Sequence, residues 1–177
     1  MVSSPPADFI LEEVAAASAA VAGALGDGAL RAPLAVVAGS GLGGLTALGR
    51  PIASIDYSAI PGLGSTHVAG HAGRWTLLKT PAGLVHCLAG RRHLYEGIEP
   101  RTAGLLMRVA ARLGVERVLL TNAAGGLTGR LVPGDLMLID DHINLAMRNP
   151  LLGSHADALG PRFVDMSEPY DRELQQT

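Results

Sequence analysis

The sequence predicts an α/β fold, in which short buried strands alternate with helices along the chain. Three observations predict it. Apolar residues recur at helical spacing in two segments, short apolar runs rich in Val and Leu lie between them, and glycine-rich or polar loops follow these runs. At 177 residues the chain suffices for one domain with a sizeable core, so we expect residues 1–177 to form a single α/β domain.

The first helix is expected over residues 7–25, where apolar side chains recur close to a helical period: Phe9, Ile10, Val14, Ala17 and Val21. Gly26-Asp27-Gly28 ends it, because glycine is preferred just beyond a helix C-terminus. A short buried strand follows over residues 34–38, and the glycine loop 39–44 comes directly after it.

The middle of the chain predicts extended structure and then a helix. Residues 52–60 are an extended candidate closed by Pro61-Gly62, and residues 75–80 and 84–88 flank a turn as a hairpin does. Residues 100–113 predict a second helix whose apolar face consists of Leu105, Leu106, Val109 and Leu113.

The last third predicts two strands and the start of a helix. Residues 118–120 are expected as a buried strand that ends at the loop Asn122 to Gly126, and residues 136–139 as one more strand. Ser167 is expected to cap a helix that begins at Glu168-Pro169. The sequence stops at Thr177 with that helix scarcely begun, so we expect a truncated protein.

Composition narrows the class of protein. Only 17% of residues are charged, so we expect another subunit to cover some apolar surface; a general bias toward Ala and Gly is the alternative. A net charge of −2 makes nucleic acid an unfavoured partner. Cys87 is the only cysteine, which suits a reducing compartment. The apolar stretch 14–25 lacks a preceding Lys or Arg and is too short to cross a membrane, so we expect a cytoplasmic protein with no membrane partner.

The loop Gly39-Ser40-Gly41-Leu42-Gly43-Gly44 follows a predicted strand and fits the dinucleotide pattern G-x-G-x-x-G. That pattern requires a helix whose N-terminus faces the pyrophosphate, but only residues 45–50 precede Pro51, which is too short for a crossover helix. The favoured alternative is a loop whose glycines let the backbone approach an anion, with Ser40 as a hydroxyl donor. An ordinary turn stays open on this motif alone.

A second cluster, Gly90-Arg91-Arg92-His93-Leu94-Tyr95-Glu96-Gly97, follows the predicted hairpin. A guanidinium can bind two phosphate oxygens and an imidazole can donate another hydrogen bond, whereas Tyr95 could reach a sugar and Glu96 could orient a basic neighbour. A solvated basic loop is the simpler interpretation. Three loops of this kind follow predicted strands, however, and three such loops can converge on one anion.

The histidines divide into site and structural candidates. His67 and His71 have the spacing of metal ligands on a helix, but Gly70 and Gly73 argue against a helix there, so no metal site is predicted. We interpret His71 as a loop residue near the anion and His86 as structural; His142 and His155 stay open, with structural roles favoured. Cys87 has only His86 beside it, on the opposite face of a strand, which argues against a nucleophile.

Five motifs stand in one order along nearly the whole chain after Leu34: Gly39-Ser40-Gly41-Leu42-Gly43, Gly70-His71-Ala72-Gly73-Arg74, Gly90-Arg91-Arg92-His93-Leu94-Tyr95-Glu96-Gly97, Thr121-Asn122-Ala123-Ala124-Gly125-Gly126-Leu127, and Gly134 to Ile139 with Asp141 to Leu145. Together they resemble the purine nucleoside phosphorylases of the trimeric, low-molecular-mass type. The resemblance implies a three-layer α/β/α fold with a mixed β-sheet, truncated here.

The resemblance also implies an activity. Inorganic phosphate would attack the anomeric carbon of a purine ribonucleoside or deoxyribonucleoside, giving free base and the sugar 1-phosphate in purine salvage, with no metal or cofactor and as a homotrimer. The residues it implies are, for phosphate, Ser40, His71, Arg91, His93 and the Ala123 backbone N–H; for ribose, Tyr95; and for the catalytic set, His93, Tyr95 and Glu96.

Several features depart from the family. Methylthioadenosine phosphorylases resemble the chain less, because they usually carry Thr in the first loop and Ala-Cys-Gly in the third. Arg92 stands where many members carry an aromatic residue, which we interpret as a tolerated surface change. Leu159 matches the place of an aromatic that caps the sugar of a neighbouring subunit. The family's purine-binding residues fall beyond Thr177, so a catalytically inactive subunit that keeps only a phosphate half-site is the second hypothesis.

Overall fold

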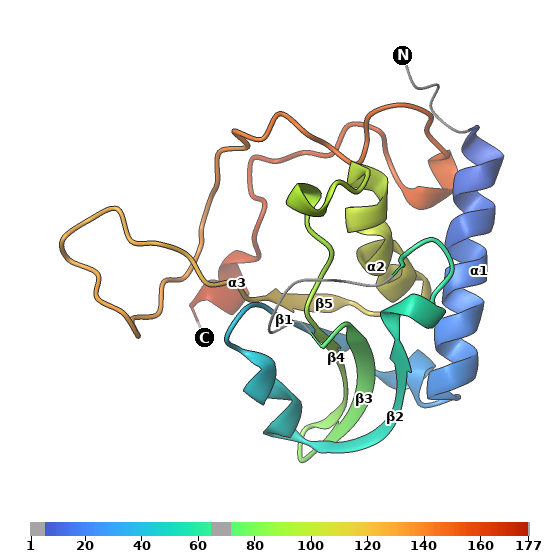
Figure 1. Cartoon of the computed structure of the whole chain (residues 1–177), viewed down its shortest axis with the longest axis horizontal. Coiled ribbons are helices and arrows are strands. Elements are labelled where there is room, and N and C mark those ends of the chain that lie inside the picture. The colour runs from blue at the N-terminus through green and yellow to red at the C-terminus, as the bar shows by residue number, and fades with distance from the viewer. Residues whose placement is uncertain (1–5, 65–71, 177) are drawn as a thin grey trace.

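The computed structural model describes residues 6–64 and 72–176 (Figure 1). Its α-helices and strands are α1 (Ala7–Leu25), β1 (Leu34–Ala38), β2 (Arg50–Asp56), β3 (Arg74–Thr80), β4 (Gly83–Ala89), α2 (Pro100–Arg112), β5 (Arg117–Leu120) and α3 (Arg172–Gln175). Its short 3₁₀ helices are η1 (Ala29–Arg31), η2 (Gly43–Leu48), η3 (Tyr57–Ala59), η4 (Leu94–Glu96) and η5 (Asp157–Leu159).

The described strands form one mixed sheet in the order β2-β3-β4-β1-β5. Strand β3 runs antiparallel to both of its neighbours, β2 and β4, whereas β1 pairs parallel with both β4 and β5. Ala38 is level with Ala89, and Val37 is level with Leu120. The carboxyl ends of β4, β1 and β5 therefore lie side by side at one edge of the sheet.

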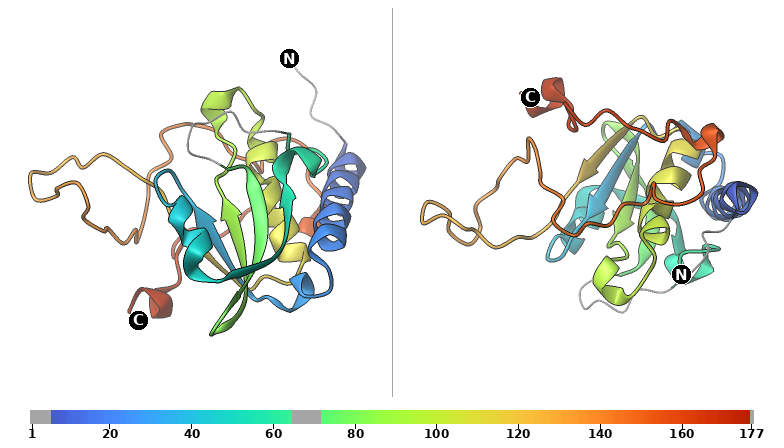
Figure 2. Two further views of the ribbon diagram at one scale, coloured as in Figure 1. Left: turned by 60° about the horizontal axis from the view of Figure 1, so that its bottom comes forward. Right: turned by 90° about the horizontal axis from the view of Figure 1, so that it is seen from above.

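The main core lies between one face of the sheet and the two long helices. Figure 2 shows α1 and α2 together on that side, with η2 on the other side of the sheet. Val21 of α1 and Val109 of α2 are fully buried there with Trp75 and Leu88 of the sheet. An ion pair of 2.9 Å joins Arg101 of α2 to Glu13 of α1, so the helices are held together by charge as well as by apolar packing.

Most of the predicted elements are confirmed. Helix α1 spans the residues expected for it, as does β1, and the predicted hairpin forms as β3 and β4. Helix α2 begins at Pro100, where proline is well tolerated because the first helical N–H has no partner within the helix. The mixed sheet with its helices confirms the expected fold class.

The buried His86 of β4 is hydrogen-bonded to β3 and to η1. Trp75 Nε1 donates a 3.0 Å hydrogen bond to His86 Nδ1, and His86 Nε2 lies 3.0 Å from the Ala29 carbonyl, so the ring is neutral with its proton on Nε2. Burial lowers the pKa of His86, and the hydrogen bond to the Ala29 carbonyl offsets part of that shift. The structural role expected for His86 is therefore confirmed.

Three predictions in the last third are wrong or incomplete. Strand β5 is an exposed edge strand, not a buried one, with Val118, Leu119 and Leu120 between 41 and 54% exposed. Residues 136–139 form no strand. The side chains of Leu136, Met137 and Leu138 are 63 to 97% exposed, so no packing holds this segment against the edge of β5.

The expected helix cap is also wrong. The last helix begins at Arg172, and Asp171 caps it by accepting a 3.0 Å hydrogen bond from the Leu174 N–H, so Ser167 plays no part. Residues 52–60 are extended only as far as Asp56, after which η3 turns the chain. No helix within residues 6–64 and 72–176 is both long and apolar enough to cross a bilayer.

Candidate functional site

The loops that follow β1, β4 and β5 meet at the carboxyl edge of the parallel strands. The Gly39 N–H donates to Thr121 Oγ1 at 2.9 Å, and this hydroxyl donates to the Val37 carbonyl at 2.8 Å. On the other side of β1, the Gly90 N–H donates to the Ala38 carbonyl at 3.0 Å. The glycine loop (residues 39–44) therefore lies between the basic loop (residues 90–97) and the loop Asn122 to Gly126. The sequence predicted that three such loops can converge, but not their order.

Gly39 is required by the closeness of the first and third loops. A Cβ at this position would lie 2.5 Å from the Thr121 carbonyl oxygen and 2.8 Å from Asn122 Cα, and both are backbone atoms. The next glycine of the loop, Gly41, has a φ of +79°, a conformation that other residues rarely adopt. The two glycines thus allow the backbone to turn tightly beside Ser40.

The basic loop is held from beneath by a buried tyrosine. Tyr57 Oη donates a 2.7 Å hydrogen bond to the Gly90 carbonyl, and the Tyr57 side chain is completely buried. Burial raises the pKa of the Tyr57 hydroxyl, with a smaller contribution from the nearby Cys87 thiol, so the hydroxyl stays protonated as a donor. Tyr57 fixes the start of the loop one residue before Arg91.

Within the basic loop, the Glu96 carboxylate binds two neighbouring residues, Arg92 and His93. Its Oε1 accepts a 2.6 Å hydrogen bond from the His93 N–H and lies 3.5 Å from His93 Nδ1, whereas its Oε2 accepts a 3.2 Å bond from Arg92 Nε. Tyr95 stacks on the His93 ring with centroids 4.8 Å apart. The loop is therefore ordered by a carboxylate at its centre, and Gly97 closes it in the left-handed conformation.

The structure places the predicted residues on these loops with different exposure. Ser40 and Ala123 are exposed, Arg91 and His93 are half-buried, and Tyr95 is 74% exposed. The Glu96 side chain is only 8% exposed. His71, like His67, lies outside the described residues.

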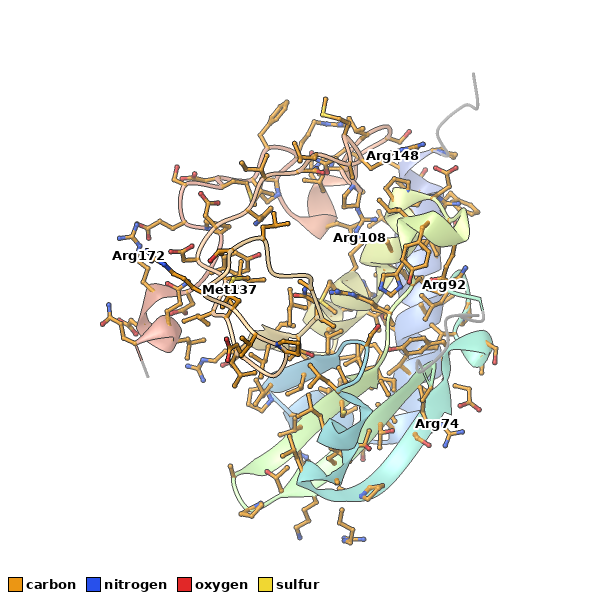
Figure 3. All side chains as sticks on the ribbon, turned by 60° about the vertical axis from the view of Figure 1, so that its left-hand side comes forward. Arg74, Arg92, Arg108, Met137, Arg148 and Arg172 are labelled. Carbon is orange, nitrogen blue, oxygen red and sulfur yellow. The ribbon has the colours of Figure 1, made fainter. Side chains whose placement is uncertain are left out.

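Arg92 corrects one expectation from the sequence. We interpreted it as a surface change, but its side chain is only 11% exposed, and Arg92 Nη1 donates a 2.6 Å hydrogen bond to the Leu63 carbonyl. Figure 3 shows Arg92 among the loops above the sheet and Arg74 lower down, beside β2. Sequence reasoning also missed Thr121 and Tyr57; Thr121 lies in a quoted motif, whereas nothing in the pattern around Tyr57 marks it.

Leu159, the expected sugar cap, lies on η5 and packs against the core of its own chain. It lines a small pocket with Ile10 of α1 and Arg108 of α2. Burial lowers the pKa of Arg108, the nearby Glu13 raises it and Arg101 lowers it. The contacts described for Leu159 lie within its own chain, and its expected role toward a neighbouring subunit stays a prediction.

The dinucleotide interpretation fails on topology. A dinucleotide site needs a strand, a helix and a second parallel strand beside the first. Here η2 is a 3₁₀ helix of six residues, and it leads to β2, which is antiparallel to β3 and is not a neighbour of β1. Among the described residues, no group of three or more His, Cys, Asp or Glu side chains could hold a metal ion.

The sequence is similar to those of known proteins. The sequence model of the phosphorylase superfamily matches residues 33–177. The purine nucleoside phosphorylase of Mus musculus is 43% identical over 149 residues, which cover 82% of this chain and 52% of the mouse protein. Purine nucleoside phosphorylase 1 of Geobacillus stearothermophilus is 43% identical over 143 residues, which cover 81% of this chain and 52% of that protein.

Solved structures agree. The Schistosoma mansoni purine nucleoside phosphorylase in complex with acetate superposes with a TM-score of 0.82 at 34% identity, covering 94% of this chain and 61% of that one. Isoform 2 from the same organism, in complex with cytosine and ribose-1-phosphate, has a TM-score of 0.78 at 37% identity, covering 93% of this chain and 58% of that one. This chain spans about half the length of the curated relatives it matches. It belongs to the phosphorylase superfamily.

Proposed function

We propose that the protein is a purine nucleoside phosphorylase, which uses inorganic phosphate to split purine ribonucleosides and deoxyribonucleosides. The observation that carries the proposal is the junction of three loops at the ends of β1, β4 and β5, fixed by the contacts of Gly39 and Gly90. The names of the relatives point the same way, because both are purine nucleoside phosphorylases.

The phosphate contacts are assigned to the three loops. The Ser40 hydroxyl, the Arg91 guanidinium, the His93 ring and the Ala123 N–H would bind the oxygens, with His71 as a fifth contact expected from the family motif. These groups supply a cation and several neutral donors at one edge of the sheet, which suits a dianion. Tyr95 would meet the ribose from its exposed position against His93, and Glu96 would hold the basic loop in place.

The reaction needs little from the protein beyond placement and charge. One phosphate oxygen forms a bond to the anomeric carbon while the bond from that carbon to the purine nitrogen breaks. The departing base takes the electron pair and gains a proton, which balances the proton that the hydrogen phosphate gives up on becoming the sugar 1-phosphate. As the base departs, the sugar carbon becomes cation-like, and a phosphate dianion clamped on its far side stabilises that charge. On this chemistry neither a metal ion nor an organic cofactor is required.

The setting follows from the same proposal. We place the enzyme in the cytoplasm, in purine salvage, as a homotrimer. The low charged fraction and the large apolar side chains exposed after β5 support assembly with other subunits, because such side chains are usually covered.

A second candidate is a catalytically inactive subunit that binds phosphate alone. The observation that favours it is the set of contacts assigned to the three loops, which are to phosphate and ribose and include none to the purine base. This candidate shares the phosphate site and differs only in what happens to a nucleoside.

Two measurements test the proposal. Incubation with inosine and phosphate should release hypoxanthine, which is detected by its oxidation in a coupled assay. Without phosphate, no hypoxanthine should be released. Phosphate at 100 times its Kd should also stabilise the chain by about 2.7 kcal/mol, whereas NAD or NADP should not. Phosphate binding with no base released would establish the inactive subunit instead, and a chain that neither binds phosphate nor releases base would refute both.

A further inference from the structure

Arg92 is buried at the junction of two loops that are distant in sequence. Its Nε donates to Glu96 Oε2 at 3.2 Å within the basic loop, and its Nη1 donates to the Leu63 carbonyl at 2.6 Å, 29 residues earlier. The guanidinium therefore joins the basic loop to the segment after η3. Only 11% of the Arg92 side chain is exposed.

The other side of this junction is built to accept the guanidinium. Gly64 has a φ of +69°, and a Cβ on it would lie 3.0 Å from Arg92 Nη1. The chain thus passes close to the guanidinium immediately after the carbonyl that binds it. A lysine could not reproduce this bridge, because its single ammonium lacks the planar fork that reaches two acceptors in different directions.

The bridge acts on the predicted phosphate residues through Glu96. The Glu96 carboxylate is 8% exposed, and its two oxygens divide between Arg92 and the His93 N–H. A buried carboxylate needs a charged or hydrogen-bonded partner, and Arg92 supplies it. With Glu96 fixed in this way, the backbone of His93 is fixed as well, and Arg91 lies between two anchored points, at Gly90 and at Arg92.

We propose that Arg92 is a positioning residue for phosphate binding, which holds the basic loop in its binding conformation by bridging Glu96 and the Leu63 carbonyl. This inference rests on the proposed function. The two adjacent arginines then have different roles. Arg91 contacts the phosphate, whereas Arg92 neutralises and orients Glu96. Arg92 itself touches no substrate.

The test measures phosphate affinity of the full chain by calorimetry, in R92M, R92K and R74M variants. R92M should bind phosphate about 10- to 100-fold more weakly, which is the worth of a charge-assisted hydrogen bond. R92K should fall between R92M and the unaltered chain, because it keeps the charge beside Glu96 and loses the fork. R74M is the matched control, since the contact of Arg74 within the described residues is an exposed ion pair with Asp56, and its loss should leave the affinity unchanged.

Amide hydrogen exchange separates positioning from general stability. In R92M the His93 amide, which donates to Glu96 at 2.6 Å, should exchange faster while the amides of β1 and β4 keep their rates. A purely structural Arg92 would instead lower Tm and raise exchange throughout, with phosphate affinity unchanged in the folded range.

The outcomes keep the two proposals apart. An unaltered chain that binds no phosphate refutes the proposed function and this inference together. An unaltered chain that binds phosphate, with R92M binding equally well, refutes only the role of Arg92. If R92M does not fold, R92K decides: weaker phosphate binding at an unchanged Tm supports the inference, and equal binding overturns it.

Discussion

Replacing Gly39 with alanine puts a methyl group where the backbone of the loop after β5 already lies. The new Cβ would be 2.5 Å from the Thr121 carbonyl oxygen, about 0.9 Å short of the 3.4 Å at which ordinary contact begins. Because the obstacle is backbone, no side-chain rotation relieves it. The two loops must move apart, which stretches the 2.9 Å hydrogen bond from the Gly39 N–H to Thr121 Oγ1.

Overpacking of this kind costs about 1–3 kcal/mol, and the strained hydrogen bond adds roughly 1 kcal/mol. We therefore expect Gly39→Ala to lower the free energy of unfolding by about 2–4 kcal/mol, measured by urea denaturation. Phosphate affinity should fall as well, because Ser40 and Ala123 flank the displaced contact.

Gly43→Ala is the matched control in the same loop. A Cβ there meets nothing within 4 Å, so this variant should be neutral or slightly stabilised by the lower entropy of its unfolded chain. If Gly39→Ala were as stable as Gly43→Ala and bound phosphate equally well, the two loops would not be in the contact described, and the argument for the site would fail with it.

Three further predictions concern the buried groups of the sheet. Trp75→Phe removes the donor to His86 Nδ1 and should lower the free energy of unfolding by about 1–3 kcal/mol in urea, because a buried acceptor is left unpaired; an unchanged value would contradict the hydrogen bond. Burial lowers the pKa of His86 in the folded chain, so the unfolded chain binds more protons near pH 6.5. The contribution of His86 to the free energy of unfolding should therefore be fully present above pH 6.5 and be lost as pH falls below it, and His86→Gln should remove that part of the slope. Burial raises the pKa of the Cys87 thiol and encloses it, so a thiol reagent at pH 8 should modify it only after unfolding; rapid labelling of the native chain would disagree.

The sequence predicted the elements that carry their own pattern. Helix α2 was predictable because its apolar residues recur at helical spacing, and the hairpin because a turn motif separates two apolar runs. The three loops were predictable as a group because each follows a strand. What placed them together was the parallel pairing of β1 with β4 and β5, which the order of the chain does not reveal.

The misses have a common cause, which is dependence on distant parts of the chain. The run 118–120 is apolar enough for a buried strand, but burial needs covering elements that the described part of the chain does not provide. Arg92 was interpreted as a surface residue because its distant partner is the backbone carbonyl of Leu63. Every residue has a backbone carbonyl, so the sequence does not mark which one an arginine binds. The role of Tyr57 was hidden for the same reason, since it binds the Gly90 carbonyl.

The position of β1 between β4 and β5 sets the order in which this region can assemble. The hairpin of β3 and β4 closes over a turn at Pro81-Ala82, so its pairing costs little chain entropy and can form early. The contact between Gly39 and Thr121 joins residues 82 apart, and its loop must close before any favourable contact offsets the entropy lost. We therefore expect the hairpin to gain protection from hydrogen exchange first during refolding, and the loop junction after β1 to gain it last.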